Sequence, residues 1–154
     1  MLLNPRVIEL PQLVDEALES HHLQAKRHGV SIMHSRSEAN LYVWADRAAL
    51  RLALEKLFKN AIEVMPYGGT LQLAIGQAHD TPGTMAQVLV TDDGPRVPPE
   101  LFARLFEPFV VSPGRRPGMS LALCRTIVER LGGRMNAWNN GKTGLTIEVR
   151  LPLP

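Results

Sequence analysis

Residues 57–71 have the sequence LFKNAIEVMPYGGTL, and the change of pattern within this stretch decides the fold class. Its first nine residues complete an apolar stripe with spacings of three and four, formed by Leu50, Leu54, Leu57, Phe58, Ala61, Ile62 and Met65. Such a stripe predicts one face of an amphipathic helix of about five turns. The segment Pro66-Tyr67-Gly68-Gly69 stops this helix. Residues 70–76 then alternate between apolar and polar side chains, which predicts a strand.

Other strands and helices are predicted on the N-terminal side of this stretch. Asp46 is a candidate cap for the long helix, and residues 41–44 before it are strand-like. Further upstream, residues 7–10 form a short extended piece. Pro11 can open a helix whose apolar stripe, which includes Leu23, runs to about Gly29. Residues 30–34 alternate weakly and predict another strand.

The C-terminal side repeats this mixture of elements. Residues 85–91 form a strand that pairs with residues 70–76 as a hairpin. A short helix over residues 98–106 and a loop over residues 110–117 follow. A helix then carries the stripe Leu121, Cys124, Ile127, Val128 and Leu131, and it ends at Gly132-Gly133. Strands over residues 134–138 and 145–151 close the chain around an Asn139-Asn140-Gly141 turn.

The order of these elements predicts an α+β fold. Strands and helices are both present, but they do not alternate as regular βαβ units. We therefore expect a two-layer α/β sandwich, in which one mixed sheet carries helices on one face. Its 154 residues are enough for a single domain that spans residues 1–154.

Composition excludes several classes of protein. The chain has 17 Lys and Arg against 15 Asp and Glu, a net charge of +2, which gives no sign of a nucleic-acid partner. Its 45% hydrophobic content excludes a disordered or collagen-like chain. A single cysteine, Cys124, excludes a disulfide framework and a cysteine zinc cluster. The apolar runs are too short to span a bilayer, so we expect a cytoplasmic domain without membrane contact.

Two of four candidate features combine polar side chains with small neighbours. Asn60 lies beside the apolar stripe of the long helix, and its amide oxygen is a type of ligand that Mg²⁺ prefers. The alternative is a boundary residue of an amphipathic helix. Asp92 leaves a strand and can accept a hydrogen bond from an exocyclic amine, while Gly94 permits close backbone approach to a flat ring. The alternative here is an ordinary Asp-Gly turn.

The other two features flank the loop over residues 110–117. Phe106 and Phe109 bracket Pro108 just before this loop, as in the root of a lid over a ligand. Gly118 precedes a helix start with Ser120 and Leu121, where exposed backbone N–H groups favour a phosphate. An ordinary surface loop followed by a helix would show the same residues.

The order of the four features resembles the catalytic ATP-binding domain of sensor histidine kinases, the Bergerat or GHKL fold. Residues 57–61 resemble the N box of that family. Residues 61–71 are similar to its nitrogen-sensor branch, and residues 105–109 resemble the F box. Residues 127–133 and 150–152 complete a likeness that extends from about residue 7 to residue 152.

The resemblance implies a role for each matching position. Asn60 would ligate Mg²⁺, Asp92 would accept from the adenine amino group, and Gly94 would line the adenine pocket. Phe106 and Phe109 would anchor an ATP lid formed by residues 110–117. Gly118 and the turn after it, with Ser120 and Leu121, would face the phosphates.

The resemblance also implies partners for the chain. The domain would bind ATP and Mg²⁺ and deliver the γ-phosphate to a histidine on a separate dimerisation and phosphoacceptor domain of the same kinase. None of the five histidines of this chain has the sequence context of that acceptor, so we expect it elsewhere. The phosphoryl group would pass to the receiver domain of a response regulator. The full protein would be a homodimer, and this domain would suit the cytosolic part of a membrane-bound sensor.

Five positions depart from the family pattern and leave a second hypothesis open. Three of them replace glycines of the family: Ser120 and Ala122 after Gly118, and, after Gly94, Arg96, whose side chain would block adenine if it entered the pocket. The other two, Lys56 and Leu145, fall near the expected nucleotide site. The first hypothesis is an active protein-histidine kinase catalytic domain. The second is a catalytically degenerate domain that acts as a regulatory or protein-interaction module. A third is another member of the same superfold, such as an anti-sigma-factor serine kinase or a gyrase-like ATPase.

Overall fold

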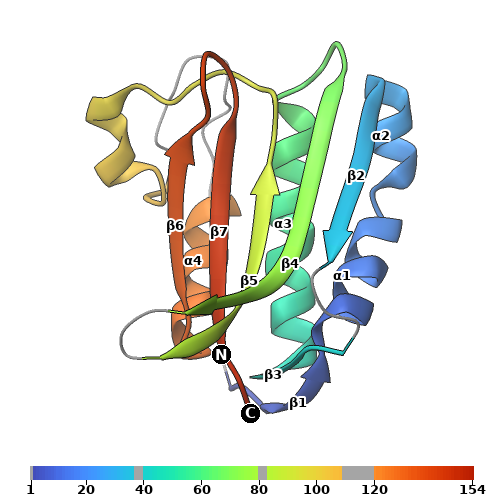
Figure 1. Cartoon of the computed structure of the whole chain (residues 1–154). Coiled ribbons are helices and arrows are strands. Elements are labelled where there is room, and N and C mark those ends of the chain that lie inside the picture. Colours follow the sequence, from blue (N-terminus) through green and yellow to red (C-terminus); the bar gives the residue numbers. More distant parts are fainter. Residues whose placement is uncertain (1, 37–39, 80–82, 109–119) are drawn as a thin grey trace.

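The computed structural model describes residues 2–36, 40–79, 83–108 and 120–154 (Figure 1). Along the chain, its helices and strands are β1 (Arg6–Glu9), α1 (Leu10–Glu19), α2 (His22–His28), β2 (Val30–Arg36), β3 (Tyr42–Ala45), α3 (Arg47–Glu63), β4 (Gly69–His79), β5 (Thr84–Thr91), the 3-10 helix η1 (Pro99–Arg104), α4 (Ser120–Arg130), β6 (Arg134–Asn139) and β7 (Leu145–Pro152).

A five-stranded sheet forms one layer of the domain. Its strand order is β2-β4-β5-β7-β6, with β2 and β4 parallel and the remaining neighbours antiparallel. Figure 1 shows α3 and α4 behind this sheet, with α1 and α2 nearer to β2 on the same side. The expected mixed sheet with helices on one face is therefore confirmed.

Two strands stand outside the five-stranded sheet. β1 and β3 pair antiparallel with each other, with Val7 opposite Trp44, and form a separate two-stranded sheet. Both belong to the segments predicted as extended, but their partners could not be assigned from the sequence. This small sheet lies near the two chain termini in Figure 1.

The long helix α3 supplies much of the core. All the stripe residues within it are at most 3% exposed: Leu50, Leu54, Leu57, Phe58, Ala61 and Ile62. Asp46 caps the helix as predicted, because its Oδ1 accepts a hydrogen bond from the N–H of Ala49 at 2.9 Å. The spacing of apolar residues thus placed the helix and its buried face correctly.

The helix expected up to about Gly29 is two helices, so that prediction is wrong in its continuity. α1 ends at Glu19, and His21 leaves helical geometry with φ −114° and ψ 2°. The His21 ring Nδ1 pairs with the carbonyl oxygen of Ala17 at 3.0 Å, a local bond that accompanies the break. Leu23, counted in the predicted stripe, is 61% exposed as a result. α2 ends at Gly29, whose φ of 71° terminates it as expected.

The described residues contain neither a helix suited to crossing a membrane nor a metal-binding group of side chains. Over the described residues, no helix is both long enough and apolar enough to cross a bilayer. In the same part of the chain, His, Cys, Asp and Glu side chains form no group of three that could hold a metal ion.

Candidate functional site

Asp92 is held where β5 ends beside the start of β7. It is only 3% exposed. Its backbone N–H donates to the carbonyl oxygen of Leu145 at 3.0 Å, and its Oδ1 accepts from the N–H groups of Leu145 at 3.3 Å and Gly94 at 2.8 Å. Because backbone groups fix this carboxylate, it is a preformed acceptor in a largely dehydrated place.

The neighbouring Asp93 has a different role. It is exposed, and its Oδ2 accepts a hydrogen bond from the N–H of Thr70 at 2.7 Å. This contact ties the turn after β5 to the first residues of β4. The structure therefore separates two adjacent aspartates, and Asp92 alone has the burial expected of a ligand-binding carboxylate.

Gly94 lies in a place that no larger residue fits without movement. A Cβ at this position would lie 2.7 Å from Cγ2 of Val64 and 3.1 Å from Oδ1 of Asp92. Gly144 approaches from the other side, with its N–H donating to the carbonyl oxygen of Gly94 at 2.6 Å. The turn after β5 is thus packed between the end of α3 and the start of β7.

Asn60 lies on the same side of α3 as this turn. Val64 follows Asn60 by one helical turn and contacts the position of Gly94, and residues four apart share a helix face. The Oδ1 of Asn60 is buried and has no hydrogen-bond partner among the described residues. A buried acceptor without a partner costs about 1–3 kcal/mol, which a ligand or a cation at this place would offset.

Lys56 lies one turn before Asn60, and its positive charge acts on the pKa of Cys124 at the interface of α3 and α4. Burial raises the pKa of the Cys124 thiol to about 12, and the Lys56 ammonium nearby partly opposes this rise. Cys124 is fully buried and donates to the carbonyl oxygen of Ala53 at 3.2 Å. The thiol is therefore a packing group and not a nucleophile.

Arg96 was the departure most able to block the site, and its side chain bonds to the turn between β6 and β7. It is exposed, and its Nη1 donates a hydrogen bond to the carbonyl oxygen of Gly141. The hydroxyl of Thr146 lies beside the strand end that carries Asp92, 2.9 Å from Oγ1 of Thr91 and 3.0 Å from Oδ1 of Asn140. Leu145, another departure, contacts Asp92 through its backbone N–H and carbonyl oxygen. These hydrogen bonds do not depend on the leucine side chain.

Asn139 is a residue that the sequence reasoning missed. Its Oδ1 accepts from the N–H of Val97 at 2.9 Å, and its Nδ2 donates to the carbonyl oxygen of the same residue at 2.8 Å. The sequence gives Asn139 the signature of a hairpin turn only, because nothing local marks a partner 42 residues away.

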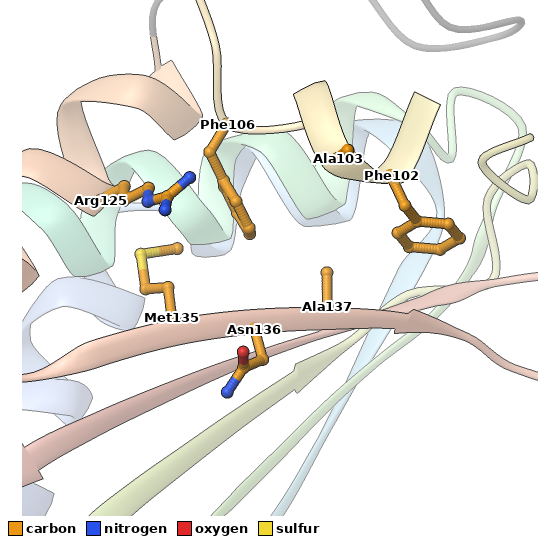
Figure 2. Close-up of a pocket in the computed structure, with 7 residues that line it drawn as sticks. All are labelled: Phe102, Ala103, Phe106, Arg125, Met135, Asn136 and Ala137. Atoms are coloured by element: carbon orange, nitrogen blue, oxygen red, sulfur yellow. The ribbon is translucent and has the colours of Figure 1, made fainter. Parts of the chain in front are cut away.

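Phe106, expected to anchor the lid, packs between η1, α4 and β6. The guanidinium of Arg125 lies 5.7 Å from the centre of its ring, a distance suited to a cation–π contact. Figure 2 shows the Phe106 ring directed toward β6, with Arg125 and Met135 on one side. A pocket of roughly 380 Å³ opens here, lined by Phe102, Ala103, Phe106, Arg125, Met135, Asn136 and Ala137.

Part of the expected site lies outside the described residues. This holds for the lid over residues 110–117, for Phe109 and for Gly118. Ser120 begins α4, and Leu121 is half-buried and packed against the core. In the described part of the site, the turn with Asp92 and Gly94 therefore lies against Val64, which follows Asn60 by one helical turn.

Comparisons of the sequence with known proteins match this chain to an ATPase family model and to parts of longer proteins. A family model described as histidine kinase-, DNA gyrase B- and HSP90-like ATPase matches residues 45–154. The sensor protein FixL of Bradyrhizobium diazoefficiens is 31% identical over 149 residues, which cover 96% of this chain and 29% of FixL. Sporulation kinase A of Bacillus subtilis is 26% identical over 145 residues, which cover 94% of this chain and 23% of that kinase. The chain thus spans less than a third of the length of these relatives.

A solved structure with the same fold covers nearly the whole chain. The catalytic domain of histidine kinase ThkA matches with a TM-score of 0.85 and 23% identity, over 98% of each chain. ThkA has also been solved in complex with the response regulator protein TrrA. At this level of identity the likeness establishes the fold.

Proposed function

The chain belongs to the family of histidine kinase-, DNA gyrase B- and HSP90-like ATPases and is a catalytic domain of the histidine kinase type, and we propose that it binds Mg²⁺-ATP beside α3 for transfer of the γ-phosphate. One observation carries the proposal: the Oδ1 of Asn60, buried and without a partner among the described residues, lies on the same side of α3 as the turn that carries Asp92.

The adenine base is the ligand that we assign to Asp92 and Gly94. A buried carboxylate with fixed orientation suits an exocyclic amino group, which is a hydrogen-bond donor. Glycine at position 94 keeps the Asp92 carboxylate free of a neighbouring side chain, because a Cβ there would lie 3.1 Å from its Oδ1. Arg96 does not conflict with this assignment, since its guanidinium is bonded to Gly141.

Mg²⁺ is the cation that fits the amide oxygen of Asn60. An Asn side-chain oxygen is among the hard ligands that Mg²⁺ accepts, and the orphaned Oδ1 supplies such an atom. When bound, the cation neutralises charge on the phosphates of ATP. Asn60 would contribute this ligand, and Gly118, Ser120 and Leu121 would place backbone N–H groups near the phosphates. Phe106 and Phe109 would anchor the lid over residues 110–117.

The acceptor of the phosphoryl group would lie outside this chain. We assign it to a histidine on a dimerisation and phosphoacceptor domain of the same kinase, in a homodimeric, cytoplasmic assembly. The receiver domain of a response regulator would take the phosphoryl group next. The ThkA complex with the response regulator protein TrrA supports this assignment by likeness of fold. For such chemistry the catalytic domain supplies positioning and charge neutralisation, with no covalent nucleophile of its own.

The hypothesis of a degenerate regulatory module gains no support. The relatives are sensor kinases, and the family model matches across the expected nucleotide site. The Arg96 side chain, which could have filled the adenine space, donates a hydrogen bond to the carbonyl oxygen of Gly141 instead. The observations thus favour a working nucleotide site despite the altered motif residues.

Thermal unfolding with nucleotide tests the proposal. ADP or ATP with Mg²⁺ at 100 times its Kd stabilises a folded protein by about 2.7 kcal/mol. For a domain of this size that corresponds to a rise in Tm of about 5–10 °C. We expect this rise in the wild type and its loss in Asn60→Ala and Asp92→Ala. Asp93→Asn is the matched control, because this exposed neighbour should leave the rise unchanged. Equal rises in all four proteins, or none in the wild type, would contradict the proposal.

A further inference from the structure

Residues 92–98 belong to no strand, so their backbone has no strand neighbour to pair with. Its partners come from the end of β6 and the turn into β7. The hydrogen bonds join Asp92 to Leu145, Gly94 to Gly144, Arg96 to Gly141 and Val97 to Asn139. Residues 92–97 and 139–145 are therefore joined along their whole length, in place of a strand ladder.

The bond at the far end of this series is made by a side chain. β6 ends at Asn139, whose backbone pairs in register with Leu145, so the sheet itself does not reach Val97. The amide of Asn139 extends across, with Oδ1 accepting from the Val97 N–H at 2.9 Å and Nδ2 donating to its carbonyl oxygen at 2.8 Å. Val97 is fully buried, so water cannot replace these two bonds.

We propose that Asn139 is a positioning residue for the nucleotide site: by satisfying both backbone groups of Val97, it fixes the C-terminal end of the turn that begins with Asp92 and Gly94. This inference rests on the proposed function. The other end of the turn is fixed by the contacts of Asp92 with Leu145. Holding both ends keeps Gly94 against Val64 and keeps the surface beside Asp92 in one shape.

The chemistry of the side chain explains the choice of residue. An amide offers a donor and an acceptor in one plane, which matches the N–H and C=O of one residue. Leucine has a similar shape and offers neither group. Aspartate has the same shape and, when ionised, offers acceptors only, so it keeps the bond from the Val97 N–H and loses the bond to its carbonyl oxygen. These two residues give graded tests of the same contact.

The test compares nucleotide affinity in Asn139→Leu and Asn139→Asp with a matched control. Asn136→Leu is that control: it lies on the same strand, and its Nδ2 donates to Oε1 of Glu148 at 3.0 Å, away from residues 92–97. The Kd for Mg²⁺-ADP is measured by titration calorimetry at a temperature where circular dichroism shows each variant folded. We expect the Kd to rise about tenfold in Asn139→Leu, because the turn beside Asp92 is then no longer held in its binding shape, and to rise less in Asn139→Asp.

The outcomes separate a positioning role from a merely structural one. A structural role lowers Tm and leaves the Kd of the folded protein unchanged, which is the result expected for Asn136→Leu. An unchanged Kd in Asn139→Leu would overturn the proposal, as would an equal loss in Asn136→Leu. If Asn139→Leu does not fold, the Kd of Asn139→Asp decides in the same way. Failure of the proposed function looks different, because the wild type would then show no binding or Asp92→Ala would bind as the wild type does.

Discussion

The guanidinium of Arg96 donates a hydrogen bond to the carbonyl oxygen of Gly141, 45 residues further along the chain. Arg96 stands where the kinase motif that this chain resembles has a glycine, so its side chain needs a place that the motif does not provide. The bond to Gly141 gives it that place, at the turn between β6 and β7. A residue that looks disruptive in the sequence thus becomes one of the links between that turn and residues 92–97.

Replacing Arg96 by glycine is therefore expected to change nucleotide affinity little. We predict that the Kd for Mg²⁺-ADP in Arg96→Gly stays within about threefold of wild type, because the Arg96 side chain contributes well under about 1.4 kcal/mol to the free energy of binding. The free energy of unfolding should fall by about 0.5–1 kcal/mol, because glycine gains more backbone freedom in the unfolded chain. Calorimetry and urea unfolding measure the two quantities. Arg96→Ala separates loss of the guanidinium from the effect of glycine, and a tenfold tighter Kd in either variant would mean that Arg96 occupies the pocket.

A methyl group added at Gly94 should clash with Val64. The Cβ of Gly94→Ala would lie 2.7 Å from Cγ2 of Val64, and overpacking of this kind costs roughly 1–3 kcal/mol. We expect that loss in urea unfolding, together with a weaker Kd for Mg²⁺-ADP. Val64→Ala removes the clashing atom, so the double variant should lose less stability than the two single losses added, by about 1 kcal/mol.

Gly83→Ala is the matched control for this prediction. A Cβ at Gly83 meets nothing within 4 Å, so alanine there should leave stability unchanged or slightly raised. Strict additivity of Gly94→Ala and Val64→Ala would show that the two residues do not touch in solution.

The sequence carried much of the fold because its strongest signals are local. The stripe of α3, its Asp46 cap and the Pro-Gly stop each depend only on residues a few positions apart, and the helix formed where they predicted. The division between α1 and α2 was missed because Leu23 was counted in the stripe although it follows Leu18 by five residues, and the break itself depends on the geometry of His21.

The sequence proposed residues for the candidate site, but it gave no sign of the contacts that hold them in place. The family likeness singled out Asn60, Asp92 and Gly94, and the structure places the turn with Asp92 and Gly94 against the face of α3 that carries Asn60. The contacts that hold them join residues far apart in the chain, such as Asn139 with Val97, and no local pattern encodes such pairs. Likewise, the direction of the Arg96 side chain depends on where the β6–β7 turn lies, which is a property of the assembled sheet.

Glu148 should make the stability of the domain sensitive to acid. This carboxylate is 3% exposed, accepts hydrogen bonds from Gln87 at 2.5 Å and Asn136 at 3.0 Å, and forms an ion pair with Nε of Arg150 at 3.2 Å. Burial raises its pKa, but these donors and the charge of Arg150 lower it by more, so the pKa lies below its usual value of 4.5. A lowered pKa means that the unfolded chain binds the proton more readily.

The stabilisation by Glu148 is therefore complete above pH 4.5 and is lost as the pH falls through the pKa of the folded state. We expect the Tm of Glu148→Gln to lie below that of the wild type at pH 7, and the gap to narrow between pH 4.5 and the pKa of the folded protein. Thermal unfolding of both proteins from pH 7 down to acid measures the gap. Parallel curves over the whole range would contradict the contribution assigned to this carboxylate.

The single thiol of Cys124 should report the opening of the interface between α3 and α4. Its side chain is fully buried, its Sγ donates to the carbonyl oxygen of Ala53, and burial raises its pKa to about 12, so almost no reactive thiolate exists near neutral pH. We predict that iodoacetamide leaves the native protein unmodified at pH 8 over the time in which it labels the protein in urea. Cys124→Ala supplies the blank.

Where labelling requires unfolding, Mg²⁺-ADP at 100 times its Kd should slow it about 100-fold, because the ligand binds only the folded chain. Labelling of the native protein at the rate of a free thiol would show that α4 separates from α3 without unfolding, and a rate that ignores bound nucleotide would show that this opening leaves the nucleotide site intact.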